Sequence, residues 1–221
     1  GRIKSRNKIV LNLRDSLANQ GVIRSLQNIS INTYQALNNG EINAGESLNV
    51  RADDVSNNAQ GLISSESGTW QVRETHQHGS LFIKNWDITG RKIDNRGNLK
   101  AGGRINLSDT FHNRTNLYGR TSAKLTNLNF KARELINNGA MEIINILAMD
   151  SEIQNTHKLR IIANNVWIKK LHNHHKLALG GMSVFQISPT LQDGLCIGDF
   201  QNHAPRSNTW IESDCELINV P

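Results

Sequence analysis

Isolated aliphatic residues separated by short polar segments recur along the chain at near-constant spacing. Each repeat contains the pattern apolar-x-Asn-x-x-x-apolar, with the two apolar residues six positions apart. Clean copies begin at Leu17, Ile93, Phe111, Leu135, Ile153 and Leu171. Weaker copies begin at Leu37, at Val55, which reaches Leu62 one residue late, and at Thr75, which carries Gln in place of Asn. The starting points are 18, 20 or 24 residues apart, and such regularity indicates a repeat fold.

Each repeat also contains a second pair of apolar residues two positions apart, which is the period of a strand. Examples are Ile29/Ile31, Leu48/Val50, Trp70/Val72, Trp86/Ile88, Ile105/Leu107, Leu128/Phe130 and Val166/Ile168. The 24-residue repeat delays its pair, so we expect its extra residues in a loop between strands. A unit of 18–20 residues with two or three short strands predicts one coil of an all-β, parallel β-helix. About nine coils then occupy residues 1–179, and residues 180–221 form a non-repetitive C-terminal cap or junction.

The Asn of each repeat is expected at the same turn of every coil, where stacked amides can hydrogen-bond to one another as a ladder. Its predicted members are Asn19, Asn39, Asn57, Gln77, Asn95, Asn113, Asn137, Asn155 and Asn173. Gly follows two residues later at Gly21, Gly79, Gly97 and Gly139, which is consistent with a left-handed backbone conformation at that turn. We interpret these residues as structural.

The composition favours an elongated molecule with a thin core, because only 37% of the 221 residues are hydrophobic and 5% are aromatic. The net charge of +6 suits an anionic partner or simply solubility. Basic residues do not cluster with aromatic ones as nucleic-acid binding requires, so no nucleic-acid partner is expected. The densest basic patch is Arg2, Lys4, Arg6 and Lys8. No segment has the apolar length of a membrane-spanning helix, so stable membrane insertion is not expected.

Candidate chemical sites are few, and each has a structural explanation. His157 and His175 occupy the same position of adjacent repeats, close to His172 and His174, and could together bind a metal. No carboxylate or thiolate lies in register with them, so we interpret them as turn residues. The close acidic pairs are Asp53–Asp54 and Asp150 with Glu152, in positions interpreted as variable turns. Cys196 and Cys215 either form one disulfide or stay as two thiols. The sequence therefore predicts no catalytic residues, no cofactor and no metal, although a polysaccharide lyase or glycosidase on a β-helix is the alternative.

The segments LNNGEINAGESLNV (37–50), IDNRGNLKAGGRINL (93–107) and LINNGAMEI (135–143) resemble the filamentous haemagglutinin repeats of bacterial two-partner secretion exoproteins. That family includes haemagglutinin-like adhesins and contact-dependent growth-inhibition effectors, and the resemblance covers residues 9–179. It implies a right-handed β-helix exported by an outer-membrane transporter and displayed or released at the cell surface. It also implies a structural or adhesive shaft that contacts a glycan or protein receptor on a host or neighbouring cell. The segment lacks an Asn-Pro-Asn-type motif of the amino-terminal secretion domain, so it corresponds to the shaft.

Overall fold

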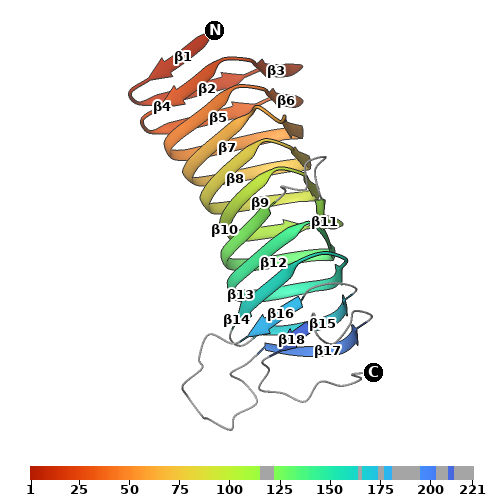
Figure 1. Cartoon of the computed structure of the whole chain (residues 1–221). Helices are drawn as coiled ribbons and strands as arrows, with labels where there is room; N and C mark the ends of the chain where they lie inside the picture. The colour runs from red at the N-terminus through yellow and green to blue at the C-terminus, as the bar shows by residue number, and fades with distance from the viewer. Residues whose placement is uncertain (115–121, 164–165, 174–176, 181–194, 203–208, 212–221) are drawn as a thin grey trace.

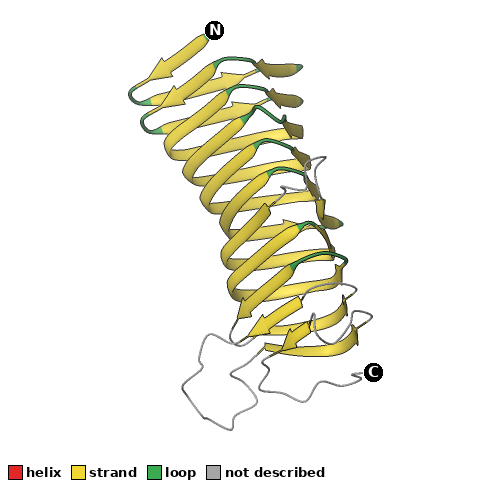
Figure 2. Cartoon of the chain, viewed as in Figure 1, coloured by secondary structure: helices red, strands yellow, loops and turns green. Residues whose placement is uncertain are grey.

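The structure is a computed structural model that describes residues 1–114, 122–163, 166–173, 177–180, 195–202 and 209–211. These residues form parallel strands and no helix, stacked into a β-solenoid of about eight turns (Figure 1). Strand covers almost the whole described chain, with short loops and turns between the strands (Figure 2). The predicted all-β parallel β-helix is therefore confirmed. No helix with the length and apolarity needed to cross a bilayer occurs among the described residues.

Each turn of the solenoid contributes a strand segment to each of three faces. The first turn comprises β1 (Arg2–Ser5), β2 (Lys8–Asn12) and β3 (Ser16–Asn19), and the second comprises β4 (Val22–Ser25), β5 (Asn28–Asn32) and β6 (Gln35–Asn38). β4, β5 and β6 pair in parallel with successive parts of the single strand β7 (Glu41–Asn57), which therefore follows all three faces. We call these the first, second and third faces, in the order in which the chain meets them.

The later turns repeat this path with long continuous strands or with shorter ones. The long strands are β8 (Leu62–Gln77), β9 (Ser80–Asn95), β12 (Ser122–Asn138) and β13 (Ala140–Asn155). The shorter ones are β10 (Asn98–Leu107), β11 (Thr110–Arg114), β14 (Leu159–Ala163), β15 (Val166–Asn173), β16 (Leu177–Gly180), β17 (Leu195–Asn202) and β18 (Thr209–Ile211).

The core is a single column of apolar side chains, because alternate residues of each strand point into the solenoid. One inward row stacks in register from turn to turn: Ile31, Val50, Trp70, Ile88, Ile105 and Phe130. All of these side chains are at most 5% exposed. Burial of each contributes about 2 kcal/mol relative to an exposed position. The apolar pairs from Ile29/Ile31 to Leu128/Phe130 are thus confirmed as core, whereas the side chains of Val166 and Ile168 lie outside the described part.

The two core tryptophans occupy different rows. Trp70 lies opposite Ile88, and Trp86 lies opposite Gly68 on one side and Gly103 on the other. The rings meet edge to face with centroids 5.1 Å apart. Gly103 has a φ of +99°, and a Cβ there would lie 2.7 Å from the carbonyl oxygen of Trp86. Glycine neighbours therefore make the room that the larger indole needs in a core one side chain thick.

A buried amide ladder runs along the third face, where the strand ends and the chain turns. Its members are Asn19, Asn38, Asn57, Gln77, Asn95, Asn113, Asn137, Asn155 and Asn173, all at most 7% exposed. Within a run, each Nδ2 donates to the side-chain oxygen of the next turn at 2.7–2.8 Å, as Asn38 does to Asn57. Gln77 accepts from Asn57 but donates to the carbonyl oxygen of Asn98, so the ladder consists of two runs. The predicted ladder is confirmed at eight of its nine positions.

The prediction of Asn39 as a ladder residue is wrong by one position. β3 and β6 pair Leu17 with Ala36 and Asn19 with Asn38. The sequence pattern places Leu37 at the inward position, but the smaller Ala36 is the residue that points inward. Asn39 instead accepts a hydrogen bond from Asn58 at 2.8 Å, outside the buried ladder.

A similar shift affects the turn after Asn57. The core position predicted for Leu62 belongs to Ile63, which pairs with Ile42 and is 2% exposed. Residues between Asn57 and Ile63 form a wider turn, closed by a hydrogen bond from the Gly61 amide to the carbonyl of Asn58. A shift of one residue moves a side chain to the other side of a strand, so both errors exchange core and surface.

The glycines that follow the ladder residues do not adopt the expected left-handed conformation. Gly103 is the only glycine of the described residues with positive φ. A Cβ on Gly40 would lie 2.1 Å from the carbonyl oxygen of Gly21, and one on Gly97 would lie 2.2 Å from that of Gly79. The repeated glycine therefore allows backbones of successive turns to approach closely, and this replaces our explanation from φ.

The 24-residue repeat places its extra residues earlier than predicted. Ala123, at the start of β12, takes the core position between Leu99 and Met141 that the sequence pattern assigned to Leu117. The insertion thus separates β11 from β12, directly after the ladder residue Asn113, and Leu117 itself lies outside the described residues. The extra residues therefore fall between two strands, but earlier in the repeat than predicted, and their own structure lies outside the described residues.

Parallel pairing continues beyond residue 180. β17 pairs with β15 from Val166–Leu195 to Asn173–Asn202, and β18 pairs with β16. These two segments of the predicted cap therefore add strands to the stack, while the domain boundary itself stays a prediction. Cys196 lies in β17, but its side chain and the whole of Cys215 lie outside the described part, so their pairing does too.

Candidate binding groove on the first face

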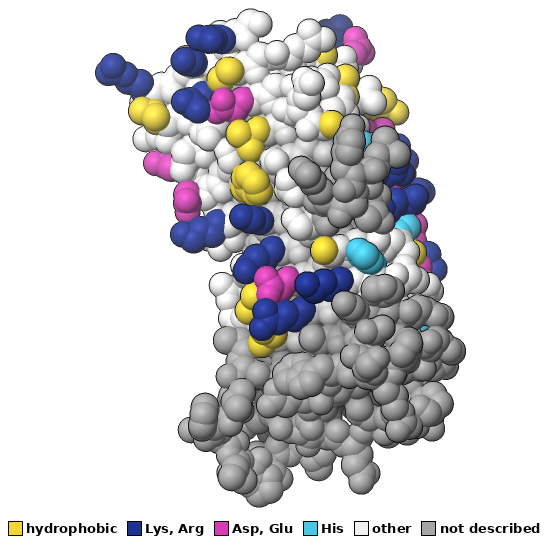
Figure 3. Space-filling model, viewed as in Figure 1, with side chains coloured by type: hydrophobic (Ala, Val, Ile, Leu, Met, Phe, Trp, Pro, Cys, Tyr) yellow, Lys and Arg dark blue, Asp and Glu magenta, His cyan; other side chains and the backbone are white. Residues whose placement is uncertain are grey.

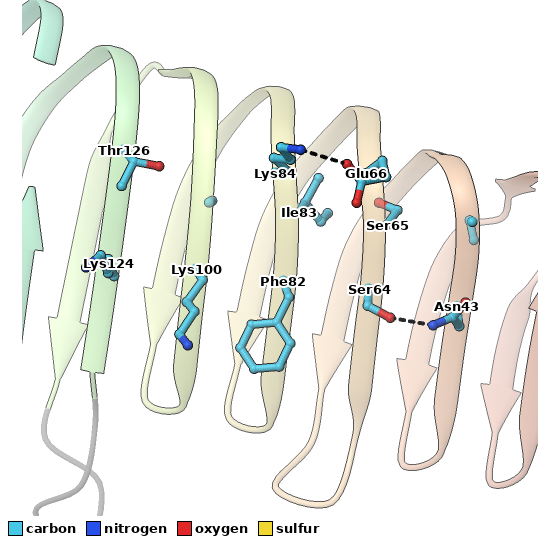
Figure 4. Close-up of a pocket in the computed structure, with 13 residues that line it drawn as sticks. Asn43, Ser64, Ser65, Glu66, Phe82, Ile83, Lys84, Lys100, Lys124 and Thr126 are labelled. Carbon is cyan, nitrogen blue, oxygen red and sulfur yellow. Dashed lines mark hydrogen bonds and ion pairs between the residues drawn. The ribbon is translucent and has the colours of Figure 1, made fainter. Parts of the chain in front are cut away.

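An open groove crosses five successive turns on the outer side of the first face. It has a volume of about 560 Å³ and is built from β7, β8, β9, β10 and β12. We call it the lysine groove, and its lining consists of Asn43, Ala44, Gly45, Ser64, Ser65, Glu66, Phe82, Ile83, Lys84, Lys100, Ala101, Lys124 and Thr126. Figure 4 shows its polar and charged side chains projecting from neighbouring strands toward the same side.

One outward row of side chains supplies the floor of the groove. Register pairs Asn43 with Ser64, Ser64 with Phe82, Phe82 with Lys100 and Lys100 with Lys124. Adjacent turns stack at about 4.8 Å, so these side chains follow one another along the axis of the solenoid. Asn43 donates to Ser64 Oγ at 2.8 Å, which orders the neutral end of the row.

Phe82 and Lys100 form the centre of the groove. The Nζ of Lys100 lies 5.5 Å from the centroid of the Phe82 ring, within the range of a cation–π contact. Lys100 is exposed and forms no ion pair among the described residues. A half-buried aromatic ring beside an ammonium without a carboxylate offers both an apolar surface and an anion-binding charge.

The other two lysines are partly balanced by carboxylates. Lys84 pairs with Glu66 at 3.2 Å, and Lys124 pairs with Glu142 at 3.0 Å. Lys124, foremost, and Arg160 keep the pKa of Glu142 below its ordinary value, so this carboxylate stays ionised at neutral pH. Of the described residues that line the groove, Glu66 alone is acidic, and the groove is therefore net positive.

The predicted N-terminal patch extends the same row. Lys4 pairs in register with Arg24, and Arg24 with Asn43, so both basic residues lie in line with the groove. Arg24 forms an ion pair with Glu41 at 2.6 Å. Figure 3 shows Lys and Arg side chains, interspersed with hydrophobic and acidic ones, over the described part of one face. The sequence located the patch but not its alignment with Lys100 and Lys124.

The residues of the groove escaped prediction because they are 18 to 24 positions apart in the chain. Phe82, Lys100 and Lys124 each follow an inward residue of the first face, namely Leu81, Leu99 and Ala123. Aligning the repeats at that position would have revealed two of them. Lys124 required the correct placement of the insertion.

The predicted candidate sites lie elsewhere. Asp53 and Asp54 belong to β7, and Asp150 and Glu152 to β13, so both pairs lie in strands rather than in the turns we expected. His157 lies in the turn after β13, and His172 in β15 opposite Gln154. His174, His175 and the side chain of Asp150 lie outside the described residues, so the metal site considered there is not described.

A charge network on the third face includes a possible metal-ligand set that the sequence analysis missed. One ligand atom each from Asp54, Glu74 and His76 lie within 4.8 Å of one another. Arg73 already pairs with Asp54 at 3.5 Å and with Glu74 at 3.2 Å, and Arg91 pairs with Glu74 at 3.0 Å. Two guanidinium groups therefore balance these carboxylates, and a cation would have to displace them.

Comparisons with known proteins assign no family. No family model matches the chain, and neither a curated protein nor a solved structure matches it. The fold and the lysine groove are therefore the basis for a functional interpretation.

Proposed function

We propose that this chain is a structural and adhesive segment of an exported bacterial surface protein, and that its lysine groove binds a linear anionic polysaccharide. The observation that carries the proposal is the row formed by Phe82, Lys100 and Lys124 in an open groove parallel to the solenoid axis. The structural part of the proposed role is supported by the continuous stack of parallel strands, which gives the described part of the chain an extended shape.

The chemistry of the groove suits an anionic sugar chain. An aromatic ring can contact the apolar face of a sugar, and ammonium groups attract carboxylate or sulfate substituents. Asn43, Ser64 and Thr126 add neutral donors and acceptors for hydroxyl groups. The further cations Lys4 and Arg24 in the same row favour a long ligand over a single sugar.

Export, surface display and passage through an outer-membrane transporter belong to this proposal and rest on the resemblance of the repeats to filamentous haemagglutinin repeats. The receptor would be a glycan of a host or neighbouring cell. The alternative is a carbohydrate-active enzyme with the same fold. It has less support, because hydrolysis of a glycosidic bond uses two carboxylates flanking the bond and the groove offers Glu66, which is paired with Lys84.

The test is binding of the purified chain to a panel of neutral, carboxylated and sulfated glycans over a salt series. Saturable binding of the anionic chains at physiological salt supports the proposal. The variant K84Q/K100Q/K124Q should lose at least about tenfold in affinity. Its matched control is R51Q/R104Q/K131Q, which removes the same charge from the second face.

Equal losses in both variants would show that net charge alone drives binding, and no binding by the native chain would also overturn the proposal. Shortening of the glycan by the native chain would favour the enzyme instead.

A further inference from the structure

The strongest positive charge of the lysine groove is confined to two turns. Lys100 and Lys124 pair in register on adjacent turns, which stack at about 4.8 Å. Lys100 forms no ion pair among the described residues and lies beside the ring of Phe82. We call Lys100 and Lys124 the cationic window, because their two ammonium groups are close enough along the axis to share one carboxylate of a ligand.

A carboxylate closes the window at one end. Glu142 is the next residue of the row after Lys124, and Arg160 follows it. The carboxylate of Glu142 lies 3.0 Å from Lys124 Nζ and 2.8 Å from Arg160. Glu142 therefore neutralises part of the positive charge on both sides of it, and the cations do not continue as an unbroken row beyond the window.

A second carboxylate lies at the other end. Glu66 lines the groove one turn before Phe82, and it pairs with Lys84 at 3.2 Å. Figure 4 shows this ion pair at the side of the groove, on the strands that carry Ser64 and Phe82. The two side chains are 66% and 74% exposed, so both charges face the ligand side. The pair as a whole is neutral, and this end of the groove adds no net positive charge.

The spacing of these charges sets the charge density of a matching ligand. A sugar unit of an extended polysaccharide is about as long as one turn of the solenoid is high, so successive sugars meet successive turns. One carboxylate can lie between Lys100 and Lys124, while a neutral sugar next to it contacts Phe82. Further anions on the adjoining sugars would lie near Glu66 or Glu142, within the Debye length of about 8 Å at physiological salt. They would meet cations that these carboxylates already neutralise.

We propose, on the basis of the proposed function, that Glu66 and Glu142 make the lysine groove selective for a linear polysaccharide of low charge density, in which a carboxylated sugar alternates with a neutral one. Glu66 and Glu142 are specificity-determining residues, because they act against a competing ligand and not in favour of the preferred one. A densely sulfated chain gains little from its additional charges in this groove. The hydroxyl groups of neutral sugars can instead donate hydrogen bonds to the two carboxylates.

The test compares two glycans of matched length on the full chain at physiological salt. Hyaluronate carries a carboxylate on alternate sugars, and heparin carries several anionic groups on each pair of sugars. We expect heparin to bind the native chain no more than about threefold more tightly than hyaluronate. The variant E66Q/E142Q releases Lys84, Lys124 and Arg160 from their ion pairs. It should bind heparin about tenfold more tightly or better, and hyaluronate with a change of less than about threefold.

The matched control is D87N/E152Q, which removes the same negative charge from the second and third faces. It should raise the affinity for both glycans equally, by less than about threefold. Circular dichroism verifies the fold of each variant. The single variants E66Q and E142Q, each expected to show part of the rise for heparin, replace the double variant if it does not fold.

The outcomes separate this specificity from the proposed function. Preference of the native chain for heparin by more than about threefold would overturn the specificity and leave glycan binding by the groove intact. An equal rise for both glycans in E66Q/E142Q, or the same rise for heparin in the control, would have the same meaning. Binding of neither glycan by the native chain would overturn both proposals.

Discussion

The inner corner of the third face and the outer row of the first face follow opposite rules. The corner repeats one residue type in every turn, from Asn19 to Asn173, and Gln77 is its one substitution. The outer row changes at almost every turn, from Lys4 through Asn43 and Phe82 to Lys100. An inward position must satisfy the same neighbours each time, whereas an outward position meets solvent. Positions that keep one residue type in every turn are therefore required by the fold, whereas positions that vary can carry the residues that bind a ligand.

Loss of a ladder amide should have the largest effect on the free energy of unfolding. N57L removes the side-chain acceptor of Asn38 Nδ2, which keeps its bonds to the carbonyl oxygens of Gly40 and Leu62, and leaves the buried Gln77 Oε1 without its donor. We expect a loss of about 3–4 kcal/mol in the free energy of unfolding. Urea denaturation measures it, with hydrogen exchange to locate the loss because solenoids can unfold by parts. The exposed Asn32 offers the control N32L, which should change stability by less than about 0.5 kcal/mol.

Adding a methyl group to a repeated glycine should cause the second-largest loss of stability. G97A places a Cβ 2.2 Å from the Gly79 carbonyl oxygen and forces two turns apart, at a cost of about 2 kcal/mol. The matched variant is G139A, whose nearest contact would be 3.0 Å, to the side-chain amide of Asn113. Thermal unfolding compares the two. Equal destabilisation would contradict close backbone approach as the reason for these glycines.

Acidification should produce a smaller loss of stability. Because the folded-state pKa values of His78 and His112 are lowered, the unfolded chain takes up protons first as the pH falls below about 6.5. The stabilisation from these neutral imidazoles is complete above that pH and decreases as the pH falls toward their folded-state values. Urea midpoints at pH 7.5, 6.5 and 5.5, without glycan, should therefore decrease. The decrease should be smaller in H78Q/H112Q. An identical dependence of the urea midpoint on pH in the native chain and the variant would show that these histidines do not cause the decrease.

Joining the two runs of the ladder should slightly increase the free energy of unfolding. In Q77N the shorter side chain can donate to Asn95 Oδ1 as the other ladder residues do, in place of the present bond to the Asn98 carbonyl. We expect stabilisation of about 0.5–1 kcal/mol. A destabilised variant would show that the longer glutamine is needed to fill this turn.

A change in the outer row should leave stability almost untouched. K100Q removes a side chain that has no ion pair among the described residues, so the free energy of unfolding should shift by less than about 0.5 kcal/mol. Its affinity for anionic glycans should nevertheless decrease severalfold. Parallel measurement of unfolding and binding on this variant and on N57L separates the two kinds of position. A large stability loss in K100Q would contradict the distinction.

The repeat period by itself determined the solenoid, its parallel strands, most of its core and eight of the nine ladder positions. These features can be predicted because every turn has the same arrangement of buried and exposed positions. Only the tertiary structure decided the register at Ala36 and Ile63, the reason for the repeated glycines, and the position of the insertion before Ala123. In a strand, a shift of one residue exchanges inside and outside, so small irregularities of spacing have large consequences. The groove depends on that register, because stacking brings together side chains that lie a full turn apart in the sequence.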